Sequence, residues 1–271
     1  MAISEAILLS SEYKLYGRSR HVAAMLEALD RINRGAGEIV LLPGLSGTGK
    51  TTLAETLRRP VVASNGYFLV GKFNQYDRNI PFVAWQQALA QFCDLLLRDD
   101  EVQRSQMVAE ILEAVGSNGQ LLLDLVPEFA RLIGPQPPLA VINPQEAQHR
   151  FAGLVRNVLQ AICRPEHPLV LFLDDWQWAD AASLRLLDHL EVGSSLRYLL
   201  VLAAYREDEI EFNPSWQETL QDLQSQSVPI RTVGVENLSM EDLRRLVAAK
   251  VTATPEALDA LTVKIYDRTS G

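Results

Sequence analysis

The chain has 271 residues and a net charge of −9, and its length fits one large α/β domain or a domain with a smaller partner. The acidic balance argues against nucleic acid as a partner, because phosphate backbones bind to basic surfaces. The longest apolar run, residues 199–204, is too short to cross a bilayer, and the first residues lack the basic segment of a signal peptide. Cys93 and Cys163 stand far apart in apolar, helix-like segments, which predicts reduced, buried thiols in a cytoplasmic protein.

The first part of the chain alternates helix and strand patterns. A helix is expected over residues 18–33, where apolar residues recur at helical spacing. Residues 38–44, EIVLLPG, form an apolar run that ends in a turn, which predicts a buried strand. A helix over residues 51–59 should stop at Pro60, and residues 67–73, YFLVGKF, predict a second strand.

A long helical insert is expected between the second and third strands. Four stretches show apolar residues at spacings of three and four, namely residues 82–97, 108–115, 121–133 and 147–163. A proline-rich connector at residues 134–144 interrupts them. The insert is therefore expected to consist of several helices with one irregular connector.

Strand patterns return after this insert. Residues 169–173, LVLFL, and residues 197–205, RYLLVLAAY, predict buried strands, and residues 230–235 predict one more. Nearly all-apolar strands that alternate with helices are typical of a parallel sheet covered on both faces. We therefore expect an α/β fold of three layers, with a mainly parallel sheet between two layers of helices.

Three further helices are expected in the second half of the chain. Residues 180–190 form the first, with Asp180 as its N-cap. Residues 239–251, with Ser239 as the cap, and residues 255–269 form the last two. These closing helices follow the last strand pattern and predict a small helical appendage.

Residues Gly44–Thr51, GLSGTGKT, match the pattern G-x-x-x-x-G-K-[ST] between an expected strand and an expected helix. In such a phosphate-binding loop (P-loop), glycines let successive amides point inward, and the following helix adds a favourable dipole. Lys50 is expected to reach the β- and γ-phosphates, and the Thr51 hydroxyl to ligate Mg²⁺. The expected nucleotide contacts are Gly44, Leu45, Ser46, Gly47, Thr48, Gly49, Lys50, Thr51 and Thr52. A glycine-rich turn capped by threonine is the alternative interpretation.

Two adjacent carboxylates follow the strand LVLFL. Ligands of parallel sheets bind beyond the carboxyl ends of the strands, so Asp174 is expected beside the P-loop, with its charge matched by Mg²⁺ on a triphosphate. Asp175 is expected to orient, or accept a proton from, the water that attacks the γ-phosphate. A helix cap or a surface ion pair is the alternative for Asp175.

The strand RYLLVLAAY ends at Arg206, which the sheet should deliver to the same edge, where a guanidinium can stabilise γ-phosphate charge. A surface pair with Glu207 or Asp208 is the alternative. Trp176 and Trp178 flank the site, and core packing is favoured for them over stacking on a ligand.

Four motifs together carry a resemblance to a known family: LYGRSR at residues 15–20, the P-loop, LFLDDWQWAD and AYREDE. The combination resembles the STAND class of AAA-type P-loop ATPases. More narrowly, it is similar to the predicted-ATPase module of bacterial, often cyanobacterial, multi-sensor signal transduction serine/threonine-histidine kinases. The resemblance implies a sheet of order 5-1-4-3-2 with a helical lid after it.

The resemblance also implies roles for single residues. Tyr16, Gly17 and Arg18 match an N-terminal motif that lies near the adenine. Lys50 and Thr51 match the Walker A motif, Asp174 and Asp175 match Walker B, and Arg206 matches a sensor arginine. The implied cofactors are ATP, or ADP after hydrolysis, and Mg²⁺.

The motifs divide the chain into three parts. Residues 1–14 are expected to be a weakly structured leader, residues 15–236 a nucleotide-binding domain, and residues 237–271 the beginning of the lid. The resemblance implies that the family's sequence continues past the Thr-Ser-Gly at residues 269–271 with the rest of the lid.

The function expected from these features is that of an ATP-binding regulatory ATPase, whose ATP and ADP states favour different lid positions and whose hydrolysis is slow. Its expected partners are other domains of a larger signalling chain or separate proteins, and a nucleotide-dependent oligomer is a further expectation. A P-loop phosphotransferase with a small acceptor and a DNA-associated ATPase of the replication-initiator type are the alternatives.

Overall fold

A computed structural model of the chain describes residues 15–77, 80–138, 144–210 and 214–269. Residues 1–14, where a leader is expected, lie outside the described residues, as do the last two residues. Within the described part, no helix is both long and apolar enough to cross a membrane.

The fold is built on a five-stranded sheet whose pairings are all parallel. The strands are β1 (Gly37–Pro43), β2 (Tyr67–Lys72), β3 (Leu169–Asp174), β4 (Leu199–Tyr205) and β5 (Ile230–Thr232). Their order is β2-β3-β4-β1-β5, which is the expected order 5-1-4-3-2 counted from the other edge. The predicted fold class is therefore confirmed. Every residue of β1, β3 and β4 is buried, as continuous apolar runs predict for central parallel strands.

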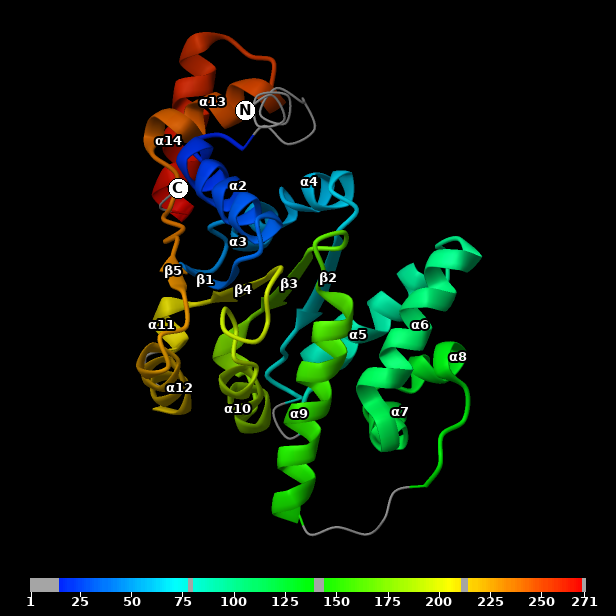
Figure 1. The fold of residues 1–271 in the computed structure, drawn as a ribbon. Helices are drawn as coiled ribbons and strands as arrows, with labels where there is room; N and C mark the ends of the chain where they lie inside the picture. The colour runs from blue at the N-terminus through cyan, green and yellow to red at the C-terminus, as the bar shows by residue number, and fades with distance from the viewer. Residues whose placement is uncertain (1–14, 78–79, 139–143, 211–213, 270–271) are drawn as a thin grey trace.

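One face of the sheet is covered by three helices near the P-loop (Figure 1). They are α2 (Ser19–Asn33), α3 (Lys50–Glu55) and α4 (Arg58–Ala63). Alternate strand residues such as Val40 and Leu42 pack against this layer, while Ile39 and Leu41 point into the opposite core. The sheet thus separates two hydrophobic cores.

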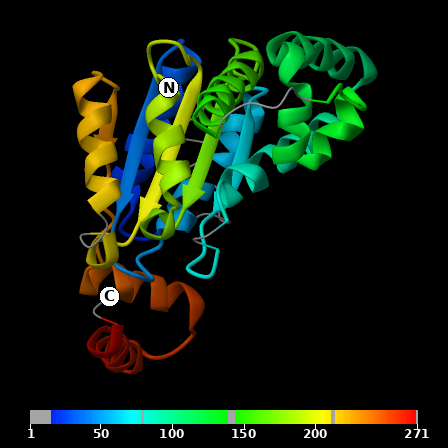
Figure 2. The ribbon, with the colours of Figure 1, turned by 90° about the horizontal axis from the view of Figure 1, so that it is seen from below.

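The opposite face carries α5 (Val83–Leu96), α9 (Pro144–Ile162), α10 (Ala181–His189) and α12 (Pro214–Ser225). The rest of the insert, α6 (Glu101–Val115), α7 (Gly119–Leu125) and α8 (Ala130–Ile133), lies outside this layer, away from the strand tips (Figure 2). The insert between β2 and β3 is helical, as expected.

Two details of the helix predictions are wrong. Pro60 does not stop a helix: α3 ends at Glu55, and Pro60 is the third residue of α4, where its missing N–H has no intrahelical partner to lose. The expected helix over residues 121–133 is broken into α7, a 3₁₀ turn at Pro127–Phe129 and α8. Pro127 begins that turn, which explains the break.

The chain crosses the carboxyl edge of the sheet after β5. The helices α13 (Met240–Lys250) and α14 (Pro255–Thr269) lie beyond the tips of the strands, on the side to which the arrowheads point (Figure 2). The predicted cap of the first is confirmed, because the Ser239 side chain accepts a hydrogen bond from the backbone N–H of Asp242.

Both cysteines are free and buried. Burial raises the pKa of the Cys93 thiol to about 12 and that of Cys163 further still. Both groups are therefore protonated core residues, as their apolar surroundings predict.

Asp180 is confirmed as the N-cap of α10 and also joins two elements. It accepts hydrogen bonds from Ser183 N at 2.9 Å and from Phe82 N at 3.2 Å. We expect Asp180→Ala to lower the free energy of unfolding by about 1–2 kcal/mol, because a cap and an inter-element contact are lost together. Asp100→Ala removes only an exposed cap of α6, so it should lower the free energy of unfolding by less. Urea titrations of the two variants and the wild type measure both values. Equal losses would contradict a second role for Asp180.

Candidate functional site

The P-loop follows β1 and runs directly into α3. Gly47 and Gly49 have φ angles of +82° and +90°, a conformation that side chains with a Cβ rarely adopt. Because a Cβ at either position would meet no atom within 4 Å, the backbone angle is what requires glycine there. The loop therefore has the shape of an open cradle of backbone groups at a helix N-terminus.

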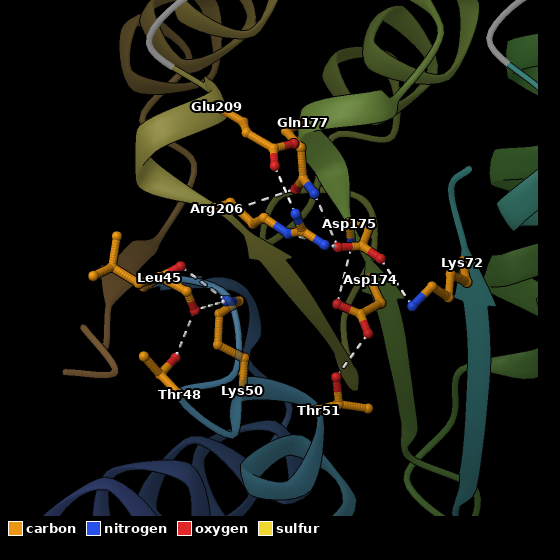
Figure 3. A network of polar contacts seen from close by, with 11 residues as sticks. Leu45, Thr48, Lys50, Thr51, Lys72, Asp174, Asp175, Gln177, Arg206 and Glu209 are labelled. Carbon is orange, nitrogen blue, oxygen red and sulfur yellow. Dashed lines mark hydrogen bonds and ion pairs between the residues drawn. The ribbon is translucent and has the colours of Figure 1, made fainter. Parts of the chain in front are cut away.

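Lys50 is buried and folded back into this loop. Its Nζ donates hydrogen bonds to the carbonyl oxygens of Gly44 and Leu45, both at 2.8 Å (Figure 3). The Thr48 hydroxyl donates to the same Leu45 oxygen at 3.0 Å. Burial lowers the pKa of Lys50, and the negative charge of Asp174 opposes that shift. The ammonium thus has backbone partners that a more negative group can replace.

Asp174 joins the tip of β3 to the start of α3. Its Oδ2 accepts a hydrogen bond from the Thr51 hydroxyl at 2.8 Å, and its Oδ1 accepts one from the backbone N–H of Asp175 at 2.9 Å. The residue is only 5% exposed. Burial raises the pKa of Asp174, and the Thr51 hydrogen bond partly offsets this effect. The structure therefore brings together the two predicted metal ligands.

Asp175 has both carboxylate oxygens engaged. Oδ2 lies 2.8 Å from the ammonium of Lys72 at the tip of β2, and Oδ1 accepts a hydrogen bond from Gln177 Nε2 at 2.9 Å. Arg206 Nε lies 3.9 Å from Oδ1. The backbone of Asp175 is left-handed, with φ +59°, and its side chain makes no helix-cap hydrogen bond. The sequence left two alternatives open for Asp175. The helix cap is not formed, whereas an ion pair is formed with Lys72, and the carboxylate in that pair is buried.

Arg206 lies at the same edge, immediately after β4. Its Nη1 is 2.6 Å from Glu209 Oε1, so its close carboxylate partner is neither of its exposed neighbours Glu207 and Asp208. Its guanidinium carbon is 5.0 Å from the centre of the Trp178 ring. Trp176 is fully buried beside Phe73 and Trp216, in agreement with the favoured core packing. Four strand tips thus contribute to one site.

The N-terminal motif lies between the P-loop and the chain that leads to α13. Arg18 is 6% exposed, and its Nη2 donates to Thr48 O at 2.9 Å and to Glu236 O. A Cβ on Gly17 would come within 2.6 Å of the Asp242 carboxyl. Tyr16 is half-buried in the same segment. The motif therefore packs against both the loop and the helical appendage.

A cavity of about 270 Å³ adjoins the P-loop at this place. Its walls come from the loop, the start of α11 (Glu207–Ile210) and the chain after β5. The lining residues are Pro43, Gly44, Leu45, Thr48, Glu207, Gly234, Val235, Glu236 and Asn237. The cavity is large enough to receive part of a small ligand whose charged end lies in the loop.

Three polar residues of the site were not predicted from the sequence: Lys72, Gln177 and Glu209. Lys72 is the last residue of β2 and pairs in register with Asp174, so the rule that parallel strand tips share an edge could have found it. Gln177 and Glu209 stand in short helical turns after β3 and β4. Their directions depend on those turns, for which the sequence carries no simple signal.

The residues present fit a magnesium–triphosphate group. Hydroxyl and carboxylate oxygens, such as Thr51 Oγ1 and Asp174 Oδ2, are the donors that Mg²⁺ prefers. The loop beside them offers backbone N–H groups and one buried ammonium, that of Lys50. These groups come from the loop after β1, from α3 and from the tip of β3, and only β4 lies between β1 and β3 in the sheet.

Comparisons with known proteins identify the family of this chain. The model of the AAA ATPase domain family matches residues 14–202. The hybrid signal transduction histidine kinase G of Dictyostelium discoideum is 24% identical over an alignment 323 positions long, which covers 95% of this chain and 9% of that protein. The chain therefore spans only a small part of this relative's length.

Two solved structures are similar in fold at low sequence identity. The E. coli HORMA:CdnC:Trip13 complex gives a TM-score of 0.47 at 12% identity, covering 96% of this chain and 76% of that one. Cdc6p from Pyrobaculum aerophilum gives a TM-score of 0.44 at 13% identity, covering 86% of this chain and 48% of that one. At such scores these likenesses carry no argument about function.

The burial of Asp174 generates a stability prediction. A carboxyl whose pKa is raised by folding binds its proton more tightly in the folded state, so the ionised form destabilises the fold above the unfolded pKa, and this penalty disappears as the pH falls. We expect Asp174→Asn to raise the Tm of the nucleotide-free protein at neutral pH by roughly 2–4 °C, the shift that about 1 kcal/mol makes in a domain of this size.

Melting curves at neutral and acidic pH test this expectation. The gain of Asp174→Asn should shrink at acidic pH, where the wild-type carboxyl is itself protonated. Asp124→Asn, on an exposed surface, should leave the Tm unchanged at both values. A lower Tm for Asp174→Asn at neutral pH would show that its ionised contacts stabilise the fold.

Proposed function

This chain belongs to the AAA ATPase domain family, and we propose that it is a STAND-class regulatory ATPase module that binds Mg-ATP and switches between ATP and ADP states. The contact between Thr51 and Asp174 is the observation that carries this proposal. It joins the end of the P-loop to the tip of β3, so a hydroxyl and a carboxylate meet near the Lys50 ammonium. A triphosphate with its metal fits that set of charges.

The P-loop and Lys50 bind the phosphates in this proposal. The ammonium leaves the carbonyl oxygens of Gly44 and Leu45 for phosphate oxygens, which carry more negative charge. The amides of the loop and the N-terminus of α3 add partial positive charge at the same place. Since Lys50 is buried, its attraction to phosphate is only weakly screened by solvent.

Thr51 and Asp174 would hold Mg²⁺, which when bound neutralises charge on the phosphate oxygens. Asp175 orients the attacking water and accepts its proton. Arg206, beside Asp175, faces the position where γ-phosphate charge increases during transfer. Because these side chains come from different strand tips, a shift of any one tip would change the rate of hydrolysis.

The adenine is proposed to occupy the cavity beside the P-loop, next to Tyr16 and Gly17. Arg18 does not need to touch the base: it supports this wall by binding the Thr48 and Glu236 carbonyl oxygens. We further propose that residues 15–236 form the nucleotide-binding domain and that residues 237–271 belong to a lid. Gly17 lies against Asp242, which gives the lid a contact with the N-terminal motif.

The setting of the module is proposed from its relative, a hybrid signal transduction histidine kinase. We propose that it works within a larger signalling chain in the cytoplasm, where other domains or separate proteins read the position of the lid. A nucleotide-dependent oligomer is part of this proposal. The net charge of −9 supports partners other than nucleic acid.

A small-molecule phosphotransferase is a weaker proposal. Its acceptor pocket would have to come from the helical insert between β2 and β3. The helices α6, α7 and α8 of that insert lie away from the strand tips (Figure 2). They therefore give no wall to the site that holds Lys50 and Asp174.

Lys50→Ala tests nucleotide binding. We expect Mg-ATP at about 100 times its Kd to raise the Tm of the wild type by roughly 5–10 °C, and to leave the Tm of the variant unchanged, because the phosphates lose their buried cation. Lys264→Ala, on the exposed surface of α14, should keep the full shift. A full shift in Lys50→Ala would contradict the proposed phosphate site.

Asp175→Asn separates binding from hydrolysis. The variant should show the wild-type Tm shift with Mg-ATP, while phosphate release falls roughly a hundredfold or more, because an amide does not accept the proton of the attacking water. The readout is phosphate released per protein with excess ATP. Hydrolysis at the wild-type rate would assign the proton transfer to another group.

A further inference from the structure

A second cavity, of about 510 Å³, lies at the end of the sheet opposite to the P-loop. Its walls come from three segments: the turn between α4 and β2, one face of α6, and the turn between α9 and β3. The two turns lead into the first residues of β2 and β3, whereas the P-loop site lies at the last residues of these strands. Each strand has six residues, so roughly 15–20 Å separate the two ends. The cavity is therefore distinct from the nucleotide site.

Contacts between the three segments hold the walls of this cavity in place. Within the α9–β3 turn, Arg164 and His167 exchange backbone hydrogen bonds at 3.2 and 3.1 Å. The Arg164 guanidinium pairs with both carboxylate oxygens of Glu110 on α6. His167 Nδ1 lies 2.9 Å from Asn65 O in the turn before β2. Because the walls are already connected, a ligand that enters has little ordering cost to offset.

His167 presents a hydrogen-bond acceptor at this cavity. A backbone carbonyl only accepts, so Nδ1 carries the proton that is donated to Asn65 O. In the neutral ring, Nε2 then has a lone pair. Among the described residues, Nε2 has no hydrogen-bond partner, and His167 lines the cavity. A ligand that uses this atom must therefore supply an O–H or N–H group.

The charges of the lining disfavour an anion. The charged residues are one cation, Arg164, and two carboxylates, Glu110 and Glu166, which give a net charge of −1. Arg164 is already paired with Glu110, and Glu166 is exposed. The described lining thus offers a phosphate or carboxylate no cation that is not already paired. An uncharged ligand fits these walls better.

Carboxamides and a small apolar area make up much of the remaining lining. Gln103 and Gln106 are exposed on α6, and each amide can both donate and accept. Met107, which is 4% exposed, and Pro165 supply apolar contacts. The described lining contains no Phe, Tyr or Trp on which a planar base would stack. Hydrogen-bonding groups around a small apolar area match a sugar ring, which has hydroxyl groups at its edge and C–H groups on its faces.

We propose that this cavity is a second ligand site, which takes an uncharged sugar of one or two rings. One hydroxyl of the sugar donates to His167 Nε2, and others bind the amides of Gln103 and Gln106. The volume of about 510 Å³ lies within the usual range of small-molecule sites. The proposal does not rest on the proposed ATPase function, and a sugar and Mg-ATP can be bound at the same time.

Saturation-transfer NMR and calorimetry test the site with glucose, galactose, maltose and sucrose. We expect at least one of these sugars to bind the wild type with a Kd of roughly 10 μM to 1 mM. Gln103→Trp should weaken that binding about tenfold or more, because the indole fills the space that the sugar needs. Gln103 is exposed, so the change should not disturb folding. Val102→Trp places the same indole on the neighbouring exposed residue of α6, outside the lining, and should leave the Kd unchanged.

His167→Phe tests the acceptor separately. Phenylalanine keeps a ring beside Tyr67, whose centre lies 5.6 Å from that of the imidazole, but it has no lone pair for a hydroxyl. The affinity for the sugar should therefore fall about tenfold. A melting curve shows whether the variant is folded at the temperature of the titration. If it is not, Gln106→Leu, a change at an exposed residue, replaces it and should weaken binding severalfold.

The remaining measurements address the charge and the place of the site. Glucose 6-phosphate should bind more weakly than glucose, because its phosphate meets a lining of net negative charge. Mg-ATP should not displace the sugar. Absence of binding by all four sugars, an unchanged Kd in Gln103→Trp, tighter binding of the phosphorylated sugar, or displacement by Mg-ATP overturns the proposal. So does a preference of this cavity for adenosine over every sugar, since a planar base would then be its ligand.

Discussion

The structure depends on the burial of two adjacent carboxylates at the carboxyl edge of a parallel sheet. β3 is buried along its whole length, so Asp174 and Asp175 leave the sheet at a point that water reaches poorly. Charges there must be matched by nearby donors and cations. The fold supplies them from its neighbours: Thr51 from α3, Lys72 from β2 and Arg206 from β4. β2 and β4, the two neighbours of β3 in the sheet, therefore supply two of the partners of these acids.

The same edge is connected to the helices that follow β5. Arg18 is held by carbonyl oxygens of the P-loop and of residue Glu236, so the loop and the chain leading to α13 share one buried cation. Burial lowers the pKa of Arg18, and Glu236 and Asp242 oppose this shift. A change in the shape of the loop would alter one of these two hydrogen bonds. In the proposed function, this connection would couple nucleotide binding to the position of α13 and α14.

The sequence predicts the parts of this fold that depend on local pattern. Apolar runs identify β1, β3 and β4, and the P-loop pattern places Lys50 and Thr51 without any knowledge of the tertiary structure. Gln177 was missed because its direction depends on a short turn, whereas Lys72 could have been found from the rule that the tips of parallel strands share one edge. The helix α12 was missed as well, because only Trp216, Thr219 and Leu223 among its residues are buried, too few for a strong helical periodicity. The prediction that a helix stops at Pro60 was wrong because proline is tolerated in the first turn of a helix.

The contacts of the site make ligand binding an exchange of partners. Lys50 already binds two carbonyl oxygens, Thr51 already binds Asp174, and Asp175 already binds Lys72. In the proposed function, a triphosphate with its metal would have to replace the first two contacts, so its net affinity would be the difference between two well-paired states. These contacts pair the charged groups of the site, and they come from different strand tips and loops. In the proposed function, such a module would report the state of its nucleotide through small shifts of these contacts.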